Sequence, residues 1–292
     1  MLIHIGYHKT ASTWLQKRFF IKENGYFKPL SMSEIVESFV IPGCFNFNSE
    51  NVRLEISKQL FSLDEVLVPL ISHERLSGDP FTGGRDAKEI AGRLHETFPN
   101  GKILIVVREQ CSIISSLYKT YVALGGTATL KKFLFPPQNE EQQWFDPSMY
   151  KYDVLIRYYC QLFGRRNVLV MNFDDLLKER TSFCKSISSF GNATIPIELV
   201  GKENESLSDI ALIFLRYFNI LFGLFSSYPL SFNRSFLWRK LRGAVYRLDR
   251  FTNRIKKPRI FKQQVEENLG DYFVESNHMV EEYLGEKIFK TD

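Results

Sequence analysis

Four short apolar runs along the chain alternate with longer stretches in which apolar residues recur at helical spacing. Short runs without polar alternation are typical of strands buried on both faces, as in parallel sheets. Helices of ten to fifteen residues between such strands serve as crossover connections. The predicted strands are residues 2–5, 65–72, 102–107 and 167–173. This alternation predicts an α/β fold in which helices flank a parallel β-sheet.

The predicted helices complete this pattern, and they are residues 10–22, 85–98, 111–124, 150–163 and 175–190. Pro69 counts against the second strand, because proline cannot donate to a strand ladder, unless it lies at a bulge or an edge. Residues 24–60 contain prolines and glycines and are predicted to be irregular with one helix. The last hundred residues show helical patterns and no strand.

The chain of 292 residues is long enough for one large domain or two small ones, with a sizeable core in either case. Its hydrophobic content of 44% and charged content of 24% are ordinary for a globular protein. We expect residues 1–200 to form the α/β core and residues 201–292 to form a helical C-terminal extension of the same domain.

Positive charge is concentrated near the C-terminus. Residues 234–262, here called the basic arm, contain eleven lysines and arginines and one acid, Asp249. The arm therefore carries +10, whereas the whole chain carries +5. This asymmetry predicts an anionic surface or partner at the arm.

Cysteine usage, the N-terminus and hydropathy indicate where the protein resides. The cysteines at 44, 111, 160 and 184 form no C-x-x-C pair, and the five histidines show no zinc spacing. These features predict a reducing compartment, the cytoplasm. The first predicted strand starts at Leu2, so no targeting peptide is expected before the fold. Residues 210–232 are apolar over nearly the length of a membrane span, but interrupting polar residues favour a buried or surface-lying helix.

The stretch LIHIGYHKTASTWLQ, residues 2–16, joins a strand, a tight loop and a helix start. Such a loop gathers backbone N–H groups and the positive end of a helix dipole at one point. A lysine and several hydroxyls add donors for a phosphate or sulfate. The common nucleotide motif G-x-x-x-x-G-K-[ST] is not met, because Lys9 follows Gly6 by three residues. A simpler alternative is that Thr10 or Ser12 only caps the helix.

The segment GYHKTASTWL resembles the loop that binds the 5′-phosphosulfate in sulfotransferases using 3′-phosphoadenosine 5′-phosphosulfate (PAPS). That family's loop reads like x-P-K-[ST]-G-T-T-x-L, on a P-loop-type parallel sheet. Here His8 replaces the proline, and Ala11 replaces the glycine, a tolerable change unless φ is positive there. The resemblance implies donor binding by Lys9, Thr10, Ala11, Ser12, Thr13 and Trp14.

A second resemblance lies about a hundred residues later, in ILIVVREQCSIISSLYKTY. The family binds the 3′-phosphate with a strand-end arginine and a serine eight residues on, which here correspond to Arg108 and Ser116. Ser112 and Ser115 are alternative hydroxyls, and the family's proline after the arginine is absent. C-terminal segments resemble bacterial members that act on carbohydrates.

The resemblance implies in-line transfer of a sulfuryl group from PAPS to a hydroxyl of a carbohydrate or glycolipid, without a metal. Lys9 would lie beside the leaving 5′-phosphate. The acceptor also needs a base, and the second predicted strand ends in His73 and Glu74. Glu74 is favoured, as in carbohydrate sulfotransferases; His73 is the alternative, and Glu74 could instead pair with Arg75.

Two further segments are candidates for contacts with the acceptor or a surface. Residues 125–149 form a long predicted loop of the kind that serves as a lid or as an acceptor wall, and its Lys131 and Lys132 could meet an acidic glycan. The basic arm interleaves its charges with aromatic residues that suit sugar rings or a membrane surface, or simply form a solvated helical face; these are Phe236, Trp238, Tyr246 and Phe251. Peripheral membrane contact is therefore expected, if at all, through residues 210–262.

Three other functions compete with the sulfotransferase prediction. A small-molecule P-loop kinase would need the nucleotide motif and a magnesium carboxylate, and neither is found. A non-catalytic anion-binding, membrane-associated protein would have lost the base, but Glu74 is present. Nucleic-acid binding through the basic arm is not expected and would show a steep salt dependence.

Overall fold

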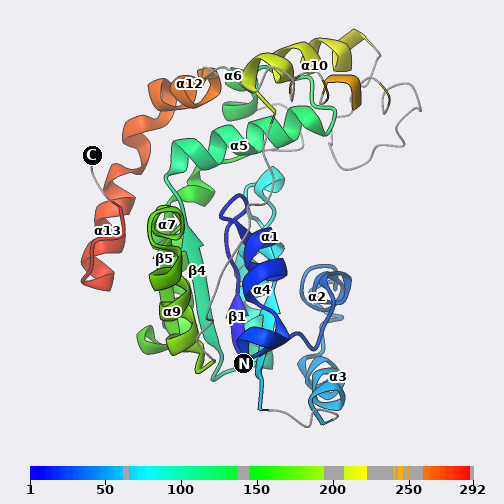
Figure 1. Ribbon diagram of the computed structural model, residues 1–292, viewed down its shortest axis with the longest axis vertical. Coiled ribbons are helices and arrows are strands. Elements are labelled where there is room, and N and C mark those ends of the chain that lie inside the picture. The colour runs from blue at the N-terminus through cyan, green and yellow to red at the C-terminus, as the bar shows by residue number, and fades with distance from the viewer. Residues whose placement is uncertain are drawn as a thin grey trace.

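The computed structural model describes residues 1–61, 66–136, 145–193, 207–221, 240, 243–245, 247, 249 and 259–289. Its centre is a five-stranded sheet in the order β2-β3-β1-β4-β5, with every pair parallel (Figure 1). The strands are β1 (Leu2–His4), β2 (Tyr26–Phe27), β3 (Val68–Ser72), β4 (Lys102–Val107) and β5 (Val168–Asn172). The predicted α/β fold with a parallel sheet is confirmed.

Alternate residues of the central strand β4 face two separate hydrophobic layers, because side chains along a strand point to opposite faces. Ile103, Ile105 and Val107 belong to the core that includes α4 (Ala87–Thr97), α5 (Gln110–Ala123) and α7 (Tyr152–Phe163). Leu104 and Val106 belong to the core formed with the helix after β1 and with α9 (Arg180–Gly191). Helices therefore cover both faces of the sheet, as an α/β fold requires.

The carboxyl ends of β1 and β3 lie side by side at one edge of the sheet. His4 is in register with Ser72, and the His73 N–H donates to the His4 carbonyl at 3.2 Å. The loops that follow these parallel strands consequently emerge at the same edge, which is where ligands bind in open α/β sheets.

Several predicted elements differ from the structure in length or number. The helix predicted for residues 10–22 is α1 (Ser12–Trp14) continued by a π-helical turn (Leu15–Phe19). Residues 24–60 contain the edge strand β2 and two helices, α2 (Met32–Phe39) and α3 (Ser49–Phe61), rather than one helix. Pro69 is tolerated because it pairs only with the short β2, and pairing of β3 with β1 starts at Leu70.

The predicted long loop and the predicted fifth helix also need correction. The segment 125–149 contains a short helix, α6 (Leu130–Leu134), whose cap Thr129 accepts from the Lys132 N–H, and a 3₁₀ turn (Pro147–Tyr150). Residues 137–144 lie outside the described part. The helix predicted for 175–190 is two helices, α8 (Phe173–Lys178) and α9, because the chain departs from helical geometry at Glu179.

The described C-terminal residues are helical, as predicted, in α10 (Asp209–Leu221), α12 (Ile260–Leu269) and α13 (Val274–Leu284). Helices α10 and α12 pack on α5 at one end of the molecule (Figure 1). Within the described ranges no helix is long and apolar enough to cross a membrane. The division at residue 200 stays a prediction, and residues 222–232 of the apolar segment lie outside the described part.

Burial of His4 in β1 predicts that acid destabilises the fold. The ring is fully buried, Nδ1 lies 2.8 Å from the Ser72 hydroxyl, and Nε2 has no hydrogen-bond partner. Burial lowers the pKa of His4 from 6.5 to about 3. Below pH 6.5 the unfolded chain therefore binds a proton at His4, whereas the folded chain leaves the ring neutral. The free energy of unfolding should fall by about 1.4 kcal/mol per pH unit below pH 6.5, which amounts to about 2 kcal/mol by pH 5.

Urea unfolding of the wild type and of His4→Gln at pH 7 and pH 5 measures this contribution. Any other titrating group acts equally in both proteins, so the difference between their pH dependences isolates His4. Equal losses of stability between the two pH values in both proteins would show that His4 is not the group responsible.

Candidate active site

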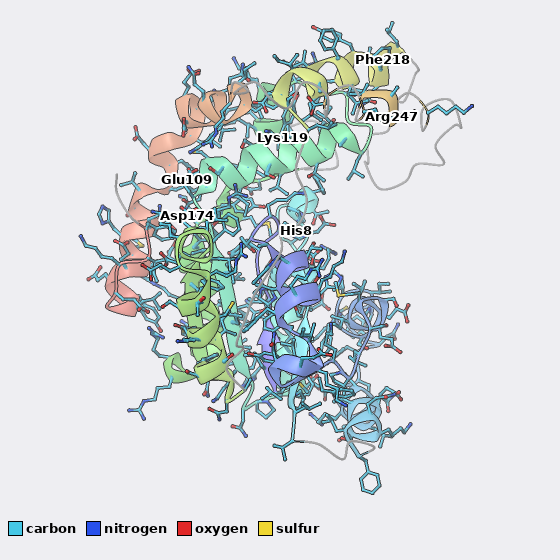
Figure 2. The ribbon with its side chains drawn as sticks, in the orientation of Figure 1. His8, Glu109, Lys119, Asp174, Phe218 and Arg247 are labelled. Atoms are coloured by element: carbon cyan, nitrogen blue, oxygen red, sulfur yellow. The ribbon has the colours of Figure 1, made fainter. Side chains whose placement is uncertain are left out.

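A cavity of about 730 Å³ opens at the carboxyl edge of the sheet. The loop after β1 forms one wall, and α5 passes over it, with His8 of the loop lying below Lys119 of α5 (Figure 2). Residues from the end of β3, from Phe173 at the start of α8 and from the start of α10 complete the lining. The predicted donor loop, the predicted base and the predicted second anchor thus share one cavity.

The loop after β1 is held by unusual backbone conformations. Lys9 and Ala11 adopt left-handed conformations, with φ of 68° and 62°. The Thr10 hydroxyl donates to the Tyr7 carbonyl at 2.5 Å and is fully buried, so it folds the loop instead of facing the cavity. The helix cap is Ala11, without a side-chain hydrogen bond, so neither Thr10 nor Ser12 acts as the simple cap considered above.

The hydroxyl of Ser12 is buried, lines the cavity and finds no hydrogen-bond partner within the protein. A buried hydroxyl without a partner costs free energy, so its position is explained if a ligand completes its hydrogen bond. Thr13 and Trp14 also line the cavity, and the guanidinium of Arg180 lies 5.1 Å from the ring centre of Trp14.

Ala11 has a positive φ, and in this conformation alanine is less favourable than the glycine that it replaces. An alanine in this conformation costs about 1–2 kcal/mol relative to its usual conformations, which glycine avoids. We expect Ala11→Gly to stabilise the protein by up to about 1 kcal/mol in urea unfolding, after the greater flexibility of unfolded glycine is subtracted.

Ala211→Gly is the control for this substitution, because Ala211 lies in the first turn of the α-helix α10. There glycine should destabilise by about 1 kcal/mol. Losses of similar size in both variants would mean that the strain at Ala11 has no energetic effect.

Arg108 reaches the loop from the end of β4. Its Nη1 donates to the Lys9 carbonyl at 2.9 Å, and its guanidinium lies 4.7 Å from the ring centre of Phe173. The Tyr152 hydroxyl donates to the Arg108 carbonyl at 2.7 Å, which fixes the position of the Arg108 backbone. The side chain therefore enters the cavity in a defined position and leaves other N–H donors for an anion.

Of the three candidate serines on α5, Ser116 is the one that lines the cavity. The Ser115 hydroxyl donates to the Ser112 carbonyl at 3.0 Å, and the Ser112 side chain hydrogen-bonds to Glu109. The geometry therefore favours Ser116 over the two alternatives as the partner of Arg108.

Glu74 and His73 point differently at the end of β3. Glu74 lines the cavity, and its Oε2 has no hydrogen-bond partner. His73 Nδ1 lies 4.0 Å from this oxygen. His73 is absent from the lining, and its Nδ1 accepts from the Arg75 N–H at 3.0 Å. Arg75 pairs with Asp79 at 3.3 Å and Asp86 at 3.0 Å rather than with Glu74.

Lys9 and His8 bring a cation and a neutral ring to the same wall. The pKa of Lys9 is lowered, first by desolvation of its ammonium and also by Arg108, while Glu74 opposes the shift. Burial, with smaller contributions from Arg75, Lys9 and His73, lowers the pKa of His8 to about 3, so the imidazole is neutral at pH 7. The wall therefore combines two cations, Lys9 and Arg108, with one carboxylate.

Sequence reasoning missed part of the lining. Thr120 and Ala123 follow Ser116 at helical spacing on α5, so the face that carries Ser116 was a readable signal for them. Leu207 and Leu212 come from the C-terminal part and gave no local signal, because only packing of α10 on α5 brings them there. Lys119 also lines the cavity, but its ammonium lies 2.6 Å from the buried carboxylate of Asp209.

Other predicted contact residues lie elsewhere. Lys131 and Lys132 are on α6 and do not line the cavity. The aromatic residues of the basic arm fall outside the described residues; these are Phe236, Trp238, Tyr246 and Phe251. Within the part of the chain that the structure describes, no group of three or more His, Cys, Asp or Glu side chains is placed to hold a metal ion.

Comparison with known proteins gives a structural likeness but no sequence match. No protein-family model matches the chain, and neither does any curated protein sequence. A sulfotransferase from Alicyclobacillus acidocaldarius matches with a TM-score of 0.51 at 18% identity, over 70% of this chain and 85% of that one.

Two other solved structures match with lower TM-scores. The sulfotransferase domain from the curacin biosynthetic pathway matches with a TM-score of 0.40 at 15% identity, over 68% of this chain and 75% of that one. Mouse sulfotransferase SULT7A1, solved in complex with PAP, matches with a TM-score of 0.38 at 13% identity, over 97% and 87%. On the likeness to the Alicyclobacillus structure, the chain has a sulfotransferase fold.

Proposed function

We propose that the protein is a PAPS-dependent sulfotransferase that transfers a sulfuryl group to a hydroxyl of a carbohydrate or glycolipid. The observation that carries this proposal is that Lys9, Glu74 and Arg108, which come from three separate segments, line one cavity on a sulfotransferase fold. Two cations suit a donor with two anionic ends, and one carboxylate suits removal of a proton from a hydroxyl.

The donor would occupy the wall formed by the loop and by α5. Its 5′-phosphosulfate would meet Lys9, the loop N–H groups, Ser12 and Thr13, while Arg108 and Ser116 would bind the 3′-phosphate. Thr10 and Ala11 would shape the loop, and Trp14 would contribute its ring to the same wall.

In the transfer step, a lone pair of the acceptor oxygen forms a bond to sulfur while the bond from sulfur to the bridging oxygen of the donor breaks. The acceptor proton moves to the Glu74 carboxylate, and negative charge grows on the leaving 5′-phosphate. The Lys9 ammonium stabilises that charge, and the site holds the three reacting groups in line.

The acceptor side of the proposal rests on the resemblance of the C-terminal segments to carbohydrate sulfotransferases and on the position of Glu74. In a carbohydrate or glycolipid, the reacting group is a hydroxyl that needs a base, and the unpartnered Glu74 Oε2 supplies one.

The four cysteines are all free thiols, which supports the proposed cytoplasmic location.

Titration calorimetry with adenosine 3′,5′-bisphosphate, the spent donor, tests the proposed donor site without knowledge of the acceptor. We expect the bisphosphate to bind more tightly than AMP or magnesium-ATP. Arg108→Ala should weaken its binding by about 10- to 100-fold, because charge-assisted hydrogen bonds to the 3′-phosphate are lost, and should weaken AMP binding much less, because AMP has no 3′-phosphate.

Arg53→Ala is a matched control, because Arg53 also donates to backbone carbonyls but lies on α3, away from the cavity. A preference for magnesium-ATP over the bisphosphate would overturn the proposal in favour of a kinase. Binding of the bisphosphate that Arg108→Ala leaves unchanged would overturn the assignment of the 3′-phosphate site.

A further inference from the structure

The outward face of α10 carries a stripe of large apolar side chains in contact with solvent. Ile210, Phe214, Tyr217 and Leu221 are 47%, 60%, 55% and 78% exposed. Their spacing of four, three and four residues places them on one side of the helix. Elsewhere in the described part, large exposed apolar residues do not form a stripe of this length on one helix.

The opposite face of α10 fixes the direction of this stripe. Leu212 and Leu215 are buried in the core. The side-chain amide of Asn219 donates to the carbonyls of Val122 and Gly126, at 3.0 Å each, and Arg216 donates to the Thr127 carbonyl at 3.2 Å. The helix therefore cannot rotate to bury its outer stripe without breaking these contacts.

The outer face of α10 also lacks negative charge. The one acid of the helix, Asp209, is buried, lies 2.6 Å from the Lys119 ammonium and accepts from the Phe261 N–H. The one acid of the basic arm, Asp249, is also buried and accepts hydrogen bonds from the Ser208 N–H and hydroxyl. Both of these carboxylates are therefore used inside the protein.

These contacts also tether the basic arm to α10. Asp249 is bound at Ser208, directly before the helix, and Phe261 is bound at its first residue, Asp209. Residues 234–262 carry a net charge of +10. An apolar stripe and a strongly positive segment are thus fastened to the same helix.

We infer that the outer face of α10 docks on a lipid bilayer with anionic headgroups. Apolar side chains with exposed aromatic rings enter the headgroup boundary, and the basic segment attracts the anionic lipids. The described part of the helix has 13 residues, about 20 Å at 1.5 Å per residue, which is shorter than the hydrocarbon core. Its inner face is buried in the protein core, so the helix would lie in the interface.

Docking through α10 would also bring the cavity to the membrane. Leu207, two residues before α10, and Leu212, on its inner face, line the cavity. If the proposed sulfotransferase function holds, on which this step rests, the acceptor class is an amphiphile held in the membrane, whose hydroxyl reaches the cavity beside an apolar wall.

Co-sedimentation with phosphatidylcholine vesicles, with and without phosphatidylglycerol, tests the docking. We expect binding to the vesicles that contain phosphatidylglycerol, weakened by high salt. The double variant Phe214→Glu/Leu221→Glu should lose at least about tenfold in partition coefficient, because two large apolar side chains no longer enter the interface. The matched control Phe45→Glu/Leu177→Glu changes residues 98% and 64% exposed, in the turn before α3 and on α8, and should bind as the wild type does.

Absence of vesicle binding by the wild type, or equal losses in both double variants, would overturn the inference. A wild-type dimer that Phe214→Glu/Leu221→Glu converts to a monomer, without vesicle binding, would assign the stripe to self-association instead. A lowered unfolding midpoint of that variant, without vesicle binding, would mean that the chain covers the stripe itself. Bisphosphate binding by the same proteins reports separately on the proposed function.

Discussion

Replacing Glu74 with glutamine should lower the rate of sulfuryl transfer by about 10²- to 10⁴-fold, the usual contribution of a general base. Glutamine keeps the size of the side chain and its place in the cavity wall, but it cannot accept the acceptor proton. Transfer of ³⁵S from labelled PAPS to a mixed carbohydrate and glycolipid extract measures the effect, since wild type and variant meet the same acceptors.

Two controls separate loss of the base from loss of the site. Adenosine 3′,5′-bisphosphate should bind Glu74→Gln about as tightly as it binds the wild type, because the donor contacts lie on other residues. His73→Gln should retain most of the activity, since the His73 ring is absent from the cavity lining and its Nδ1 accepts from the backbone. If His73→Gln lost the transfer while Glu74→Gln kept it, the two roles would have to be exchanged.

Lys9→Met should lower the transfer rate by about 10²- to 10³-fold while weakening bisphosphate binding far less. The ammonium acts on charge that develops as the bond from sulfur to oxygen breaks, so its effect is larger in the transition state than in the bound ground state. Methionine keeps an unbranched side chain of similar length and removes the charge. The same ³⁵S assay and calorimetry give the two quantities.

Lys58→Met removes an exposed lysine of α3 and should change neither quantity. Parallel losses of rate and of bisphosphate affinity in Lys9→Met would mean that the lysine only binds the donor. Lys9 would then be a binding residue, and stabilisation of the leaving group would have to come from elsewhere in the loop.

The sequence predicted best those features that depend on local periodicity. The strand Lys102–Val107 has the bounds expected from its sequence. Its run of five apolar residues after Lys102 is typical of a strand at the centre of a parallel sheet. Helix α5 begins and ends within one residue of its expected limits. Where a strand has only two residues, as in β2, no periodicity exists to be read, and the element was missed.

Long-range packing explains what the sequence could not show about the site. The spacing of eight residues between Arg108 and Ser116 was visible, but the preference for Ser116 over Ser115 depends on which way α5 faces. The choice between Glu74 and His73 likewise depends on how the chain turns after β3. The positive φ of Ala11 could not be read from residue type, since alanine gives no signal for a left-handed conformation.

The hydrogen bond from Arg108 to the Lys9 carbonyl joins the two ends of the proposed donor site across 99 positions of sequence. The arginine and the loop cannot move independently, because a shift of either one stretches this bond. In the proposed donor site, this bond would fix the distance between the two groups that bind the anionic ends of the donor. A nucleotide with the right total charge but the wrong spacing between its phosphates can engage one end only, so selectivity here is a matter of length as much as of charge.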